Sequence, residues 1–154
     1  MERHDTILLV SPRLEIRTVY RGILDGHYNL LEAGNIRQAQ VLLEQNLRCV
    51  AAVMLDVTEP DKLSLEDFEK WSGSEALEQV PAIILTANED PVLLNRAFEL
   101  GALDVIPHYY DPVALLHRVE NIIELNLYKQ HLQIILQILI KLMLLILIFS
   151  YITP

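Results

Sequence analysis

Hydrophobic positions along the first 130 residues alternate between two patterns. Five short segments are apolar at almost every position, which is typical of strands that are covered on both faces of a parallel sheet. Between them, apolar residues recur three or four positions apart, as in amphipathic helices. The predicted strands are 6–10, 28–33, 51–56, 81–86 and 103–106, and the predicted helices are 14–24, 36–46, 65–71, 91–100 and a last one that begins at Pro112.

This order of elements predicts an α/β fold, a doubly wound five-stranded parallel sheet, followed by a long hydrophobic C-terminal helix. Asp111 is the expected N-cap of the last helix, with Pro112 in its first turn. We assign residues 1–130 to the sheet domain and residues 131–154 to a hydrophobic helical tail.

Asp56 is the most informative polar residue of the predicted sheet. It ends the third strand directly after the apolar residues 51–55, and Pro60 follows in the next turn. In an open parallel sheet, ligands bind beyond the carboxyl ends of the strands, so a carboxylate there is a candidate site residue. The alternative is a solvated turn residue, because aspartate is common in turns.

Three local motifs indicate a family. The segment Leu55–Asp61 reads LDVTEPD, the fourth strand ends in Thr86-Ala87, and Gly101-Ala102 precedes the fifth strand. In these features residues 5 to about 130 resemble a response-regulator receiver domain, the flavodoxin-like phosphoacceptor module of bacterial two-component signalling. The resemblance implies that Asp56 accepts a phosphoryl group within a phosphorelay and that Thr86 is the switch hydroxyl, with Ala87 beside it in the phosphate pocket.

Two family positions depart from this pattern. Receiver domains have a pair of acidic residues after the first strand that hold Mg²⁺, and this chain has Ser11 and Pro12 there. The family's lysine after the fifth strand is replaced by His108, and its aromatic switch position corresponds to Val105. The resemblance therefore implies a degenerate pocket.

These replacements weaken any metal site. Mg²⁺ is bound mainly by one or two carboxylates together with waters and phosphate oxygens. Asp56 and the carbonyl of Thr58 supply few ligands, and Arg13 adds positive charge nearby. We expect no cofactor except Mg²⁺ bound more weakly than about 10 mM, as at a lone carboxylate. Glu59 is an alternative oxygen ligand.

The replacements also have ordinary structural interpretations. Ser11 followed by Pro12 is a typical helix start, with the serine as N-cap. A protonated His108 would partly replace the lysine, but a histidine in a loop at the strand end is the simpler interpretation. Asp56 would then have at most Arg13 nearby, so Asp56→Ala should change the free energy of unfolding by less than about 1 kcal/mol.

Other chemistries fit the sequence less well. Haloacid-dehalogenase-like phosphatases also use an aspartate after a strand, but Thr58 stands where their second aspartate would be. Cys49 is the only cysteine and is expected to be a buried or half-buried apolar residue. The net charge of −9 and the acidic segment 56–78 argue against nucleic-acid binding, which needs a basic surface. We therefore do not expect an enzyme or a nucleic-acid partner.

Residues 132–149 are apolar except for Gln133, Gln137 and Lys141, which lie four residues apart. Segment 134–152 has 19 residues, close to the 20 or so that a transmembrane helix needs. Lys129, His131 and Lys141 lie on the side of the sheet domain, as expected if that domain is cytoplasmic. Three interpretations remain: a tether to the inner membrane, a self-associating helix, or the product of a truncated or frameshifted gene. The charged residues 1–5 do not resemble a signal peptide.

The function predicted from the sequence is that of a degenerate receiver module in two-component phosphorelay signalling, with weak or no phosphorylation of Asp56. Its expected partner is a sensor histidine kinase or another signalling protein. The alternative is a docking or oligomerisation domain that does not depend on phosphate and is anchored to the membrane by its last helix.

Overall fold

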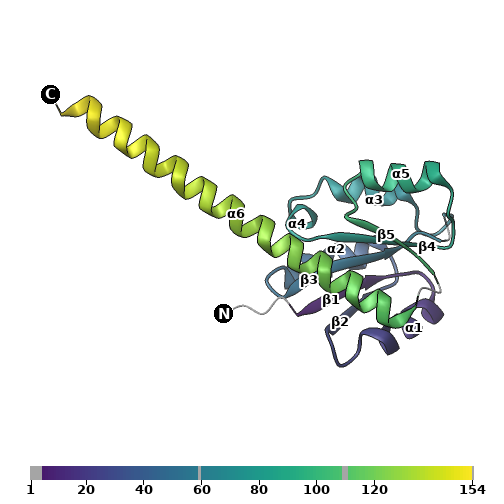
Figure 1. Cartoon of the computed structure of the whole chain (residues 1–154). Helices are drawn as coiled ribbons and strands as arrows, with labels where there is room; N and C mark the ends of the chain where they lie inside the picture. The colour runs from purple at the N-terminus through teal and green to yellow at the C-terminus, as the bar shows by residue number, and fades with distance from the viewer. Residues whose placement is uncertain (1–4, 59, 109–110, 154) are drawn as a thin grey trace. The chain divides into compact units, whose positions relative to one another are not determined.

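All five predicted strands form, and they lie side by side in one parallel sheet (Figure 1). The computed structural model describes residues 5–58, 60–108 and 111–153. The order in the sheet is β2-β1-β3-β4-β5, and each neighbouring pair is parallel. The strands are β1 (Thr6–Val10), β2 (Asn29–Ala33), β3 (Val50–Asp56), β4 (Ala82–Thr86) and β5 (Asp104–Pro107).

Helices connect the strands, as a parallel sheet requires. They are α1 (Leu14–Leu24), α2 (Ile36–Asn46), α3 (Leu65–Ser72), α4 (Glu75–Glu78), α5 (Pro91–Glu99) and α6 (Pro112–Ile152). The predicted α/β fold and the long apolar helix are confirmed. The four-residue helix α4 was not predicted, because it is too short to show a hydrophobic period.

Polar side chains fix where several helices begin. Asn35, Ser64 and Asp90 each accept a hydrogen bond from the first turn of α2, α3 and α5. Asp111 does the same for α6, where the backbone N–H of Ala114 donates to its Oδ1 at 2.9 Å, so the predicted cap is confirmed. Local sequence therefore sets the helix starts.

Both faces of the sheet are buried along its central strands. Alternate residues of a strand point to opposite faces, and in β1 and β3 both sets are fully covered. One set packs with α2, α3, α4 and α5 in a single apolar cluster that includes Leu8, Val53, Leu55, Leu43, Phe68, Trp71 and Ala97. The opposite set includes Ile7, Leu9 and Met54, none of which is exposed.

The described chain divides into two compact units, the first ending at Ile123 and the second starting at Glu124. In the first unit, α6 buries Leu115, Val119, Ile122 and Ile123, which recur at helical spacing. The division at residue 130 remains a prediction. The expectation for Cys49 was wrong: it lies in the turn between α2 and β3, and its side chain is exposed.

Candidate functional site

The carboxylate of Asp56 is completely buried at the carboxyl end of β3. It does not lie in a solvated turn, because β3 continues through Asp56 and pairs it with Leu85 of β4. A charged carboxylate is stable in such a place only if other groups replace the water that it has lost. The groups that contact the Asp56 carboxylate therefore determine whether it stays charged and whether it can react.

One carboxylate oxygen, Oδ2, is held by two residues that follow β1. The hydroxyl of Ser11 donates a hydrogen bond to it at 2.6 Å. The guanidinium of Arg13 approaches the same oxygen, with Nη2 at 3.2 Å and Nε at 3.4 Å. Arg13 is thus near Asp56, as the sequence suggested, and forms a salt bridge with it.

The other oxygen, Oδ1, has partners that follow β3 and β5. The backbone N–H of Thr58 donates to it at 3.0 Å, and Nε2 of His108 lies 3.0 Å away. The second ring nitrogen of His108 is 3.2 Å from the hydroxyl of Tyr20, a buried residue of α1. Asp56, His108 and Tyr20 therefore form a buried chain of polar contacts.

The parallel sheet brings these residues together. Ser11 follows β1, Asp56 ends β3 and His108 follows β5, so all three lie at the carboxyl edge of one sheet. The backbone N–H of His108 donates to the carbonyl of Thr86 at 2.9 Å, which fixes the residue against β4. The side chain of Thr86 is nearly fully buried, and its hydroxyl accepts a hydrogen bond from the Asn88 N–H at 3.0 Å.

One sequence interpretation of the replacements was wrong, and another was incomplete. Ser11 does not cap a helix: α1 begins at Leu14 after Arg13, which makes no side-chain capping bond. The serine hydroxyl instead donates to the buried carboxylate of Asp56, and its oxygen accepts the backbone N–H of Arg13 at 3.1 Å. His108 does lie in a turn at the end of β5, as predicted, but only 3% of its side chain is exposed and its ring contacts Asp56.

The other candidate positions contribute less. Pro12 and Thr58 are half-buried, and Ala87 is exposed. The hydroxyl of Thr58 is a buried group without a hydrogen-bond partner among the described residues. Tyr20 was not predicted as a site residue, because it lies within the amphipathic helix predicted over 14–24 and nothing local signals that its hydroxyl reaches His108.

This set of donors does not suit Mg²⁺. The carboxylate of Asp56 is already paired with a guanidinium, and no group of three or more His, Cys, Asp or Glu side chains that could hold a metal occurs among the described residues. Glu59, the alternative ligand, lies outside them. We therefore derive no chemical step through a metal ion here.

Burial alone would raise the pKa of Asp56, but hydrogen bonds from His108, Ser11 and Thr58 outweigh it and hold the pKa well below its usual range. Burial together with the nearby charge of Asp56 raises the pKa of Tyr20 to about 12, against a smaller opposing effect of Arg13. Asp56 is therefore a stable anion, and Tyr20 stays a neutral phenol.

The lowered pKa of Asp56 predicts how stability depends on pH. A carboxylate whose pKa is lower in the folded than in the unfolded chain stabilises the fold above the unfolded value of about 3.9, and that contribution is lost as pH falls below it. The free energy of unfolding should therefore decrease between about pH 4 and pH 2. Denaturant titrations at several pH values would measure it, and the decrease should be smaller in Asp56→Asn. Parallel curves for the two proteins would contradict the prediction.

No family model matches the chain. Among curated proteins, it is 28% identical over 119 residues to histidine kinase P4 of Formosa agariphila, covering 77% of this chain and 8% of that protein. It is 30% identical over 118 residues to the transcriptional regulatory protein CpxR of Klebsiella pneumoniae, covering 76% of this chain and 48% of the regulator. The chain thus spans less than half the length of each relative.

A solved structure agrees with these relatives. The response regulator receiver domain protein (CheY-like) from Methanospirillum hungatei superimposes with a TM-score of 0.70 and 18% identity, over 81% of this chain and 98% of that one. The chain has the fold of a response-regulator receiver domain. Asp56 of this chain ends the third strand, where the resemblance in sequence placed the phosphoacceptor.

Proposed function

We propose that this chain is a receiver module of two-component signalling in which Asp56 holds the domain together and is not an efficient phosphoacceptor. The observation that carries this proposal is that both oxygens of its carboxylate have partners. Oδ2 is bound by Ser11 and Arg13, and Oδ1 by Thr58 and His108. A carboxylate that attacks phosphorus needs one oxygen free for the incoming phosphoryl group.

Charge supports the same conclusion. Phosphoryl transfer to a carboxylate brings negative charges together, and catalysis depends on metal ions and cations that neutralise them. In this domain the guanidinium of Arg13 already neutralises Asp56 at 3.2 Å. The module would act by docking to a sensor histidine kinase or another signalling protein, in one fixed conformation and without its own enzymatic activity.

Labelling with acetyl phosphate tests this proposal. The full chain, incubated with Mg²⁺ and acetyl phosphate, should show little or no phosphorylation by intact mass, and Mg²⁺ with beryllofluoride should not shift its amide NMR signals. A variant with Ser11→Asp, Pro12→Asp, Arg13→Ala and His108→Lys serves as the comparison. It introduces the acidic pair after β1 and the lysine after β5 that the resemblance to receiver domains leads one to expect. Rapid stoichiometric, Mg²⁺-dependent labelling of the original chain that disappears in Asp56→Asn would disprove the proposal.

We further propose that residues 134–152 tether this module to a membrane. Helix α6 is long and apolar enough to cross one, with a mean hydropathy of 2.6 in its most apolar window, none of which is buried. Nineteen residues at 1.5 Å each span about 28 Å, close to the 30 Å hydrocarbon layer of a bilayer. The first unit would then lie on the cytoplasmic side.

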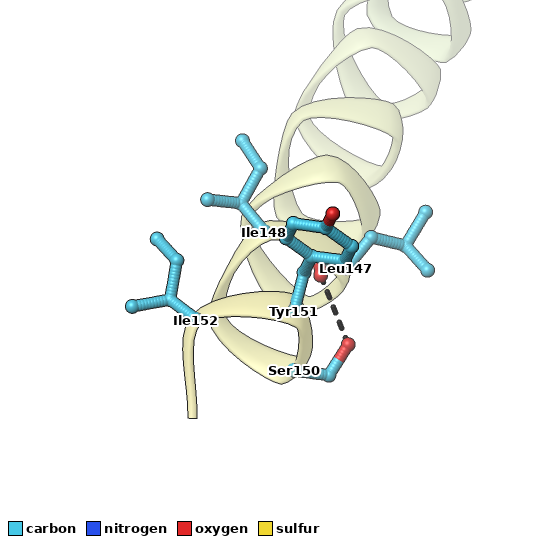
Figure 2. Close-up of a pocket in the computed structure, with 5 residues that line it drawn as sticks. All are labelled: Leu147, Ile148, Ser150, Tyr151 and Ile152. Carbon is cyan, nitrogen blue, oxygen red and sulfur yellow. Dashed lines mark hydrogen bonds between the residues drawn. The ribbon is translucent and has the colours of Figure 1, made fainter. Parts of the chain in front are cut away.

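The hydroxyl groups near the end of the segment are compatible with this environment. Figure 2 shows the side chains of the last turns around the helix, with the Ser150 hydroxyl directed back to the carbonyl of Leu147, a hydrogen bond of 2.9 Å. Thr153 bonds the Phe149 carbonyl in the same way at 2.7 Å. Both hydroxyls thus find acceptors within their own helix and need no water. Carbonate extraction of membranes from expressing cells should leave the full chain in the pellet.

A further inference from the structure

Gln133, Gln137 and Lys141 form a polar stripe on the second unit, within segment 132–149, whose other residues are all apolar. At 100° per residue, positions four apart advance by about 40°, so the stripe covers only about 80° of the circumference. All three side chains are exposed. The hydroxyls of Ser150 and Thr153, in contrast, are satisfied by their own backbone.

A primary amide carries two N–H donors and one carbonyl acceptor, and hydrocarbon offers partners for neither. If segment 134–152 spans a bilayer, Gln137 lies about 5 Å inside the hydrocarbon layer and Gln133 at its edge. Lys141 lies deeper, but its long side chain can extend back toward the surface, which the shorter glutamine side chain does less well. The glutamines therefore need a partner within the membrane.

We infer that this partner is a second copy of the same chain, and that two helices pair in parallel through the stripe. The inference rests on the proposed tether. Every copy inserts with its first unit on the same side, so the two helices run in the same direction. Gln137 then meets Gln137 at equal depth, and each amide can donate to and accept from the other. Lys141 lies at one flank of this contact, where the two ammonium groups can avoid each other.

Cysteine cross-linking distinguishes the two faces of the helix and keeps both glutamines. Leu144 lies about 20° from Gln133 around the helix, on the stripe, whereas Ile146 lies about 220° away on the opposite face. Each is replaced by cysteine in a full chain that also carries Cys49→Ser, which removes the exposed native thiol. Oxidation in membranes should give a disulfide-linked dimer with Leu144→Cys and several-fold less with Ile146→Cys.

A second measurement tests the glutamines themselves. Fluorescence transfer between labelled full chains in lipid vesicles should show a dissociation constant about tenfold weaker for Gln133→Leu with Gln137→Leu, the size expected for two interhelical hydrogen bonds. Ser150→Ala also removes a polar group, but Ser150 lies about 260° from Gln133, off the stripe, so this variant should leave the dissociation constant unchanged within about twofold. Equal cross-linking from both faces, or none in chains that carbonate leaves in the membrane, would overturn the pairing but not the tether. Release of the chain by carbonate would overturn both.

Discussion

Replacement of Asp56 by alanine should lower the free energy of unfolding by about 3 kcal/mol, because it leaves several buried donors without their acceptor. Ser11 and His108 are buried, and Arg13 is only partly exposed. None of the three would regain full contact with water in the folded state. The expectation of less than about 1 kcal/mol, which assumed a nearly isolated carboxylate, is revised for this reason.

Urea denaturation of the full chain in detergent, followed by the fluorescence of Trp71 in the first unit, would measure the effect. Asp104→Ala is the matched control, since Asp104 also binds an arginine through both oxygens, with Arg118 at 2.6 and 2.7 Å. That pair is more exposed, so its loss should cost about 1 kcal/mol. If the two variants lost the same stability, the buried network around Asp56 would have no special importance.

Two charges in the apolar segment should release the chain from membranes. An aspartate at the centre of a transmembrane helix costs about 2.5–3.5 kcal/mol on insertion scales, so Leu142→Asp with Leu145→Asp removes about 6 kcal/mol of insertion free energy. In carbonate extraction, the original chain should stay in the pellet and this double variant should move to the supernatant. The same change at two exposed valines of the first unit, Val41→Asp with Val92→Asp, is the control and should stay in the pellet. Equal extraction of all three proteins would contradict the tether.

Much of the fold could be predicted from the sequence because it is specified locally. Continuous apolar runs mark strands that are covered on both faces, and capping residues such as Asn35 and Asp111 mark the helix starts. The position of Asp56 at the carboxyl edge of the sheet followed from the same pattern. Helix α4 was missed because four residues show no hydrophobic period.

The contacts within the site could not be predicted in the same way. Ser11, Asp56 and His108 are separated by 45 and 52 residues, and only the register of the parallel sheet brings them together. Ser11-Pro12 has the local pattern of a helix start, but α1 begins at Leu14, and the Ser11 hydroxyl donates to the buried carboxylate of Asp56. The local sequence shows that Ser11 could begin an exposed helix. It contains no information about the Asp56 carboxylate, which accepts the Ser11 hydroxyl from 45 positions away.

The contact between Ser11 and Asp56 has a consequence for how this protein can evolve. A mutation to aspartate at position 11 would place a second carboxylate where a hydroxyl now lies 2.6 Å from the first, with Arg13 as the neighbouring guanidinium for both. Loss of Arg13 alone would leave Asp56 without that cation. Each single step toward a metal-dependent switch therefore destabilises the domain before the switch can work. Under the proposed function, a phosphate-controlled switch at this site would therefore need at least two substitutions made together.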